Sequence, residues 1–454
     1  MSQYEKNSLS LGNAIAMGTG VMIGAAIFAL LGQVAELSGE YFAIAIVMGG
    51  VISGFSAYSY IKMAHAYPSA GGIAMFLQKA YGKGTITAFA ALLMAFSMVL
   101  NESLVARTFG TYTMQLFNGS ENSFWVPVLG VGLLIGAFII NILSNEVIGK
   151  TAMTTASIKI GGILIFAFGA LWAADFTLGS AMPSGAPENS VAEYLASLAL
   201  AILAYKGFTT ITNSGGEIKE PHKNVGRAII WSLIICGVVY FITALAVGAN
   251  LEIPQIIEAR DYALAEAARP LYGHYGLWFT VGIAIVATIT GVIFSIFAVS
   301  RMTAMLTNMK LIPHSHFGMP GTIQQHMLVY ITVISITLTI LFDLSGIAAM
   351  GAIFYLIMDI IIHVGVLRHM KEKVKANPII VITAIVLDAV VLVGFIWVRA
   401  QTNPTVIIVS GALILVTFFG EKLFLKNTKQ NDDDNENQES DGDNGKKDNK
   451  IDVS

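Results

Sequence analysis

Long apolar runs constrain the fold of this chain more than any other feature. The stretches 328–341 and 379–398 contain hardly a polar residue, and similar runs follow one another along almost the whole sequence. A helix needs about 20 apolar residues to cross the hydrocarbon core of a bilayer, which is roughly 30 Å thick. Only 12% of the residues are charged, about half the share found in an average soluble protein. The sequence therefore predicts an all-α integral membrane protein.

About twelve transmembrane helices account for the apolar runs. They cover residues 12–37, 41–67, 85–117, 124–143, 150–174, 190–217, 226–250, 273–306, 324–341, 345–368, 378–398 and 404–425. Lys and Arg residues gather in alternate loops, with seventeen of the 26 on one side and three on the other. Because positively charged loops stay in the cytoplasm, we expect a multi-pass protein of the cell membrane whose termini are both cytoplasmic.

Glycines interrupt two of the predicted helices near the middle of the membrane. The first helix contains Gly18, Gly20 and Gly24, and the sixth contains a glycine-bearing run from Tyr205 to Glu217. The two helices occupy equivalent places in two halves of the chain, as in inverted-repeat transporters. Unwound backbone is tolerated at this depth only where it lines a cavity, and its free amides attract carboxylates. Glycine pairs also occur where helices merely pack, but the matching second break favours a site.

Three motifs resemble those of the amino acid–polyamine–organocation (APC) permeases, and they occur in family order. The run Gly20-Val-Met-Ile-Gly-Ala-Ala-Ile-Phe28 resembles the signature of helix 1. The run Tyr67-Pro-Ser-Ala-Gly-Gly72, followed by Phe76-Leu and Ala80-Tyr-Gly82, resembles the segment after helix 2. The run Glu217-Ile-Lys-Glu-Pro-His-Lys-Asn-Val-Gly-Arg-Ala228 resembles the loop after helix 6. The resemblance covers about residues 8 to 425.

This resemblance implies a LeuT-type fold of five plus five inverted helices with two peripheral helices. The cytoplasmic N-terminus would then be residues 1–11, the two transmembrane repeats 12–174 and 190–368, and the peripheral pair 378–426. Residues 427–454 are rich in Asn, Asp, Glu and Lys, so we expect a disordered acidic cytoplasmic tail. Such a tail is either a solvated end or a regulatory segment.

The resemblance also implies a binding site for an amino acid. Amides of Ala25, Ala26 and Ile27 would hold its carboxylate, and carbonyls of Met22, Leu203 and Lys206 would accept from its amino group. The family often has Ser-Gly where this chain has Ala25-Ala26, so one hydroxyl and some backbone freedom are missing. The candidate substrate-binding residues are Met22, Ile23, Gly24, Ala25, Ala26, Ile27, Asn101, Glu102, Leu203, Tyr205, Lys206 and Gly207.

Lys159 is the candidate for proton coupling. It follows Lys150 by nine residues, hence by about 14 Å along the fifth helix, which is near mid-membrane. Removal from water disfavours the charged form of a lysine, so such a residue can exchange a proton during a transport cycle. The position resembles that of the helix 5 lysine in proton-coupled permeases of the ApcT type, which reaches between helices 1 and 8. The alternative is a lysine permanently paired with a carboxylate.

Other charged residues within the spans have open roles. Lys206 would meet an acidic substrate, pair with Glu102 or point into packing. Asp359 and His363, one turn apart, would share a proton or form a buried hydrogen-bonded pair. Asp388 lies outside the core that the resemblance implies and receives no role. We expect no metal site, because His314 and His316 lack nearby ligands, and the single cysteine, Cys236, excludes an internal disulfide.

Together these features predict a secondary transporter that works as a proton-coupled symporter by alternating access, and the resemblance implies that its substrates are amino acids. An amino acid exchanger of the same fold is the alternative. A channel would need rings of polar groups along a pore, and a membrane-embedded enzyme would need a catalytic set that the sequence lacks. We expect no cofactor apart from the coupling proton, a lipid bilayer and a small-molecule substrate as partners, and no nucleic acid.

Overall fold

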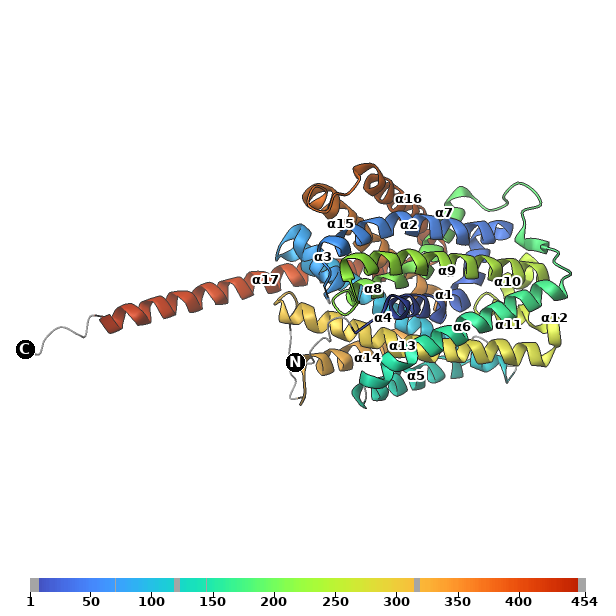
Figure 1. The fold of residues 1–454 in the computed structure, drawn as a ribbon, viewed down its shortest axis with the longest axis horizontal. Coiled ribbons are helices and arrows are strands. Elements are labelled where there is room, and N and C mark those ends of the chain that lie inside the picture. Colours follow the sequence, from blue (N-terminus) through green and yellow to red (C-terminus); the bar gives the residue numbers. More distant parts are fainter. Residues whose placement is uncertain (1–7, 70, 118–122, 144, 314–318, 448–454) are drawn as a thin grey trace, which may run out of the picture.

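The fold is a bundle of helices, seen in a computed structural model that describes residues 8–69, 71–117, 123–143, 145–313 and 319–447. Most of the long helices run side by side along one axis of the body (Figure 1). The long helices are α1 (Leu11–Ser38), α2 (Phe42–Ala66), α4 (Thr85–Gln115), α5 (Trp125–Leu143), α6 (Asn145–Ala173), α7 (Val191–Tyr205), α9 (Pro221–Asn250), α13 (His274–Asn308), α14 (Ile323–Leu341), α15 (Leu344–Gly365), α16 (Pro378–Thr402) and α17 (Pro404–Lys447).

Short helices connect the long ones. They are η1 (Gly39–Tyr41), α3 (Gly72–Tyr81), η2 (Gly179–Ala181), η3 (Lys206–Phe208), α8 (Thr209–Asn213), α10 (Ile253–Glu258), α11 (Ala263–Ala267), α12 (Arg269–Tyr272) and η4 (Val366–Met370). No strand occurs in the described ranges, where the sole β-type contact is an isolated bridge between Leu9 and Ile218. The prediction of an all-α protein is confirmed.

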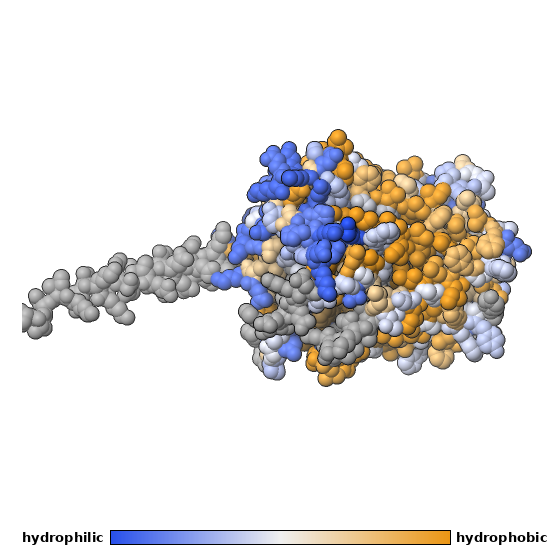
Figure 2. All heavy atoms as spheres, in the orientation of Figure 1, coloured by the Kyte–Doolittle hydropathy of each residue, from blue (hydrophilic) through white to orange (hydrophobic). Residues whose placement is uncertain are grey.

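The outer surface of the bundle is apolar, as a lipid environment requires. Large side chains such as Val393 and Trp397 are 68% and 63% exposed. Figure 2 shows apolar residues over the middle of the body and hydrophilic residues gathered at the end from which α17 extends. The described residues contain eleven helices long and apolar enough to cross a membrane, plus the shorter apolar helix Leu11–Ile23. These results confirm about twelve spans.

The first helices of the two predicted repeats lie together in the centre. Helix α1 packs against α7, α9, α6 and α13. Helix α16 also reaches inward and packs against α7, α15 and α2, whereas α17 packs against α4, α16 and α15. The last two helices therefore differ, since α16 packs closely on α7, the helix that carries the second predicted break.

One of the two predicted helix breaks is present and the other is not. Helix α7 ends at Tyr205, a single 3₁₀ turn (η3) follows, and α8 then continues to Asn213. Helix α1, in contrast, is continuous from Leu11 to Ser38, so the prediction of an unwound turn there is wrong for this structure. The physical reason is the sequence Ala25-Ala26, because alanine has the highest helix propensity of all residues.

The acidic C-terminal stretch continues the last helix. Helix α17 extends to Lys447 and leaves the body of the molecule (Figure 1), where the sequence predicts disorder from residue 427. An acidic helix without tertiary contacts is marginal in water. Disorder in this stretch therefore stays a prediction, and residues 448–454 lie outside the described ranges.

Close packing between α2 and α7 gives a first testable prediction. A Cβ at Gly49 would lie 3.0 Å from the backbone carbonyl carbon of Ala201, whereas one at Gly54 would meet nothing within 4 Å. Gly49→Ala is therefore expected to destabilise the protein by about 1–3 kcal/mol, as overpacking does. Gly54→Ala is the matched control on the same helix, and it should raise the melting temperature slightly because alanine favours a helix. Equal thermal unfolding of the two variants in detergent would contradict this packing.

Candidate functional site

A small cavity lies where α1, the α7–η3–α8 segment, α4 and α13 meet. Its volume of about 20 Å³ is room for roughly one water molecule, so the cavity is too small in this structure to hold an amino acid. Its lining residues are Val21, Met22 and Ala26 of α1, Met98 and Asn101 of α4, Leu203, Ala204, Lys206, Gly207, Thr209 and Thr210 of the broken helix, and Ser295 of α13.

Half of the predicted substrate-binding residues line this cavity. They are Met22, Ala26, Asn101, Leu203, Lys206 and Gly207. Ile23 and Ile27 are buried in α1 but do not line it. Gly24 and Ala25 belong to α1, and their surroundings lie outside what the structure describes. Tyr205 points elsewhere, because its ring borders a separate groove between α2 and α9.

At the break in the second repeat, the backbone of η3 packs closely against the backbone of α1. A Cβ at Gly207 would lie 2.9 Å from the backbone nitrogen of Met22 and 2.6 Å from its Cγ, so only glycine lets η3 pack on α1 in this way. Tyr240 of α9 fixes the same junction, since its hydroxyl donates to the carbonyls of Met22 at 2.6 Å and Ala204 at 3.3 Å. Two central helices thus meet at the cavity wall.

The three carbonyls predicted to receive a substrate amino group already accept hydrogen bonds. The carbonyl of Met22 accepts from Tyr240, that of Leu203 from the backbone N–H of Lys206, and that of Lys206 from the Thr209 hydroxyl at 2.8 Å. The carbonyl of Lys206 also accepts from the backbone N–H of Thr209, so both of its lone pairs are used in this structure. The predicted role stays a prediction for these atoms.

Lys206 points from the break to α4. Its Nζ donates to the carbonyl and the hydroxyl of Ser97, at 2.8 and 2.9 Å, and its side chain also borders the cavity. Within the described residues no ion pair joins it to Glu102. Of the three roles left open by the sequence, the structure therefore disfavours the ion pair.

Glu102 is buried behind the cavity rather than in its wall. Its two carboxyl oxygens accept from the hydroxyls of Ser295 at 3.3 Å and Ser335 at 2.9 Å. Helices α13 and α14 supply these serines. Because Ser295 also borders the cavity, it connects the carboxyl group to the site. The predicted direct contact of Glu102 with substrate stays untested.

Lys159 lies at the midpoint of α6 and is completely buried. Its Nζ donates to the carbonyl of Gly20 at 2.8 Å. Gly20 is part of α1 and directly precedes Val21 and Met22, which border the cavity. No carboxylate in the described part of the chain lies within 4.0 Å of this ammonium, so the alternative of a permanent ion pair finds no partner here.

Sequence reasoning missed several residues of the cavity wall. Thr209 and Thr210 directly follow the η3 turn, and a pair of hydroxyls beside a helix break is a signal that a sequence does offer. Met98 and Ser295 lie within long apolar helices. Nothing in their local sequence distinguishes them from packing residues.

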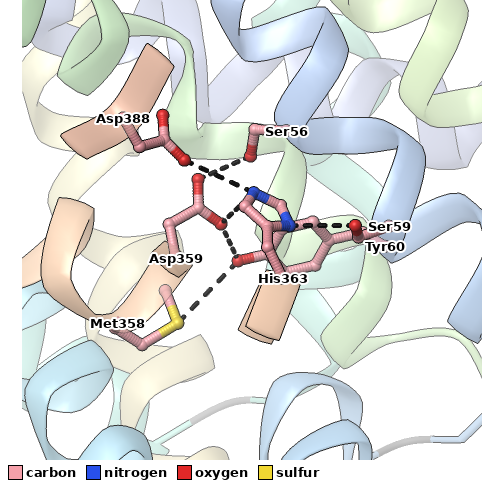
Figure 3. A network of polar contacts seen from close by, with 7 residues as sticks. All are labelled: Ser56, Ser59, Tyr60, Met358, Asp359, His363 and Asp388. Atoms are coloured by element: carbon pink, nitrogen blue, oxygen red, sulfur yellow. Dashed lines mark hydrogen bonds and ion pairs between the residues drawn. The ribbon is translucent and has the colours of Figure 1, made fainter. Parts of the chain in front are cut away.

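A second polar cluster is formed by residues of α15, α16 and α2 (Figure 3). His363 Nε2 lies 3.5 Å from Asp359 Oδ1 and 3.4 Å from Asp388 Oδ2. Asp388, to which the sequence assigns no role, lies in this group because α16 packs on α15. His314 and His316, for which the sequence predicts no metal site, lie outside the described residues.

The chain is similar in sequence to known membrane transport proteins. A family model described as "Amino acid permease" matches residues 9–422. The inner membrane transport protein YbaT of Escherichia coli is 28% identical over 418 residues, covering 90% of this chain and 94% of the relative. The protein MJ0609 of Methanocaldococcus jannaschii is 31% identical over 298 residues, covering 64% and 67%. The serine/threonine exchanger SteT of Bacillus subtilis is 24% identical over 277 residues, covering 60% and 61%.

Proposed function

We propose a coupling mechanism for this chain, which belongs to the amino acid permease family and therefore transports amino acids across a membrane rather than catalysing a reaction. The mechanism is symport of an amino acid with a proton. The observation that carries it is Lys159, a lysine with no exposed surface whose single described hydrogen bond goes to the backbone of α1.

The proton would act through the contact between α6 and α1. A protonated Lys159 holds the carbonyl of Gly20 with a charge-assisted hydrogen bond, which is about twice as strong as a neutral one. Loss of the proton weakens this bond and removes a buried charge from the apolar bundle. Because Val21 and Met22 follow Gly20 and border the cavity, protonation biases the part of α1 that faces the substrate.

The substrate would be held at the junction of α1 and the broken helix. Its amino group is matched by the carbonyls of Met22 and Leu203, and its carboxylate by amides of residues 25–27 once the turn at Gly24 opens. Since α1 is continuous in this structure, binding requires that opening. Alternating access then consists of movement of the α1–α2–α7–α9 group against α4, α5, α13 and α14.

An exchanger is the second candidate, and the similarity to the serine/threonine exchanger SteT favours it. The two functions differ in one measurement on liposomes that contain the purified protein. Symport should accumulate labelled amino acid into empty liposomes under an imposed pH gradient. Exchange should give uptake only when the liposomes are preloaded with unlabelled amino acid, whatever the gradient.

Lys206 provides a test of side-chain selectivity. Because Lys206 lines the cavity and carries an ammonium group, Lys206→Met is expected to weaken binding of acidic amino acids by about tenfold or more, the equivalent of one charge-assisted hydrogen bond. Neutral amino acids of similar size should lose much less. Competition against one labelled substrate by aspartate, glutamate, asparagine and glutamine measures this. A uniform loss across the four competitors would leave Lys206 with a packing role through Ser97 alone.

A further inference from the structure

The cluster around His363 joins three helices inside the apolar bundle. Asp359 and His363 come from α15, Asp388 from α16, and three hydroxyls from α2 (Figure 3). Asp359, His363 and Asp388 each have 0% exposed surface. An ionised side chain at such depth costs about 2.5–3.5 kcal/mol on insertion scales. The charge of this group of side chains must therefore be balanced from within.

The two carboxyl groups differ in what surrounds them. Asp359 accepts short hydrogen bonds from Ser56 and Tyr60, both at 2.5 Å, which is the environment of an ionised carboxylate. Among the described residues, neither carboxyl oxygen of Asp388 has a hydrogen-bond partner, although the side chain is completely buried. An ionised Asp388 would therefore have only the imidazole of His363, at 3.4 Å, to stabilise it.

The imidazole lies between the two acids. Its Nδ1 is 2.9 Å from the Ser59 hydroxyl, and its Nε2 makes no hydrogen bond within the part of the chain that the structure describes. A protonated His363 facing two ionised carboxylates would leave one uncompensated negative charge. One further proton makes the cluster neutral. The side chain that gains most from that proton is Asp388, because its oxygens accept no hydrogen bond from the described residues, whereas Asp359 accepts two.

We propose that Asp388, His363 and Asp359 form a proton-binding site, separate from Lys159, that links α2 to α15 and α16. The cluster holds an imidazolium, an ionised Asp359 and one exchangeable proton on Asp388. The remaining titratable side chains that face it are Tyr60 of α2 and Tyr355 of α15. Both are phenols without charge at neutral pH, so the charge of the site changes through Asp388.

The site is connected to the break in the second repeat. The ring of Tyr60, which donates to Asp359, packs edge to face on Phe208 with centroids 5.4 Å apart. Phe208 belongs to η3 and follows Gly207, which borders the cavity. Loss of the proton from Asp388 would leave a net negative charge between α16 and α15 and would loosen their hold on α2. Whether Asp388 carries a proton would therefore affect the packing of η3 at the cavity wall.

Infrared spectroscopy on the full-length protein tests the site directly, because a protonated carboxyl has a C=O stretch that an ionised one lacks. The wild type at neutral pH is expected to show this band, and Asp388→Asn should remove part of it. His363→Gln should shift the frequency of the part of the band that comes from Asp388 without removing that part. Lys159→Met and Glu188→Gln, the latter an exposed loop position, are the controls and should leave it unchanged. An identical band in wild type and Asp388→Asn would overturn the proposal.

Transport and metal analysis separate this site from the coupling residue and from a metal centre. In a Lys159→Met background, exchange across liposomes should still vary with pH, and adding Asp388→Asn should abolish that variation. This result does not depend on whether Lys159 drives symport. Unchanged pH dependence in the double variant would contradict the proposal. Stoichiometric zinc in protein equilibrated with Zn²⁺, absent from Asp388→Asn, would show instead that the three side chains are metal ligands.

Discussion

Replacing Lys159 with methionine is expected to abolish accumulation of amino acid under a proton gradient while exchange continues. Methionine fills a similar volume in the buried position but cannot carry the proton that holds Gly20. A membrane potential supplies about 2.3 kcal/mol per charge per 100 mV, so one coupled proton sustains roughly a 50-fold gradient at that potential. This gradient should disappear in the variant. Uptake of labelled substrate into liposomes with an imposed pH gradient measures the effect.

The control for this experiment lies on the same helix. Ile158→Met changes the adjacent residue, which is 51% exposed on the outer face of α6, and it should accumulate substrate as the wild type does. Sodium should alter neither protein. Uphill transport by Lys159→Met, or a strict sodium requirement in the wild type, would refute proton coupling at this lysine.

Replacing Gly207 with valine is expected to cause a comparable loss at the binding step. The new Cβ would fall 2.9 Å from the backbone nitrogen of Met22, so α1 and η3 would have to separate at the cavity. Overpacking of this kind costs about 1–3 kcal/mol. If that cost falls on the binding conformation, affinity decreases by about 5- to 150-fold. Equilibrium binding of labelled substrate to the purified variant measures this without any gradient.

Gly161 offers the matched comparison for the glycine variant. It lies on α6, and a Cβ there would meet nothing within 4 Å. Gly161→Val should therefore bind substrate nearly as well as the wild type. If Gly207→Val bound normally while both variants were folded, the junction of α1 and η3 would not be the binding site.

Helix positions follow from sequence here because the membrane imposes one length and one composition on each span. The predicted range 273–306 differs by only one or two residues from α13, His274–Asn308. The break after Tyr205 was also predictable, since glycines such as Gly207 interrupt an apolar run there. In such segments local sequence and the surrounding lipid favour the same structure.

Contacts between distant helices were not predictable in the same way. Asp388 lies in a span with the hydropathy of any lipid-facing helix, and its proximity to His363 arises only because α16 packs on α15. Ser295 supports Glu102 from another helix, 193 residues away. Glycines at α1 predicted a break, yet the two alanines that follow retain the helix. A hydropathy profile contains none of this pairing information.

The unbroken α1 has a consequence for apparent affinity. If the binding-competent conformation is the one with an opened turn at Gly24, only that fraction of molecules binds, and the observed dissociation constant is the intrinsic one divided by that fraction. Alanine in place of glycine stabilises a helix by about 1 kcal/mol, which reduces the opened fraction about fivefold. A ligand with a carboxylate would offset this free energy of opening by binding the amides that the opened turn exposes. An amine without a carboxylate would lack that interaction and would bind more weakly.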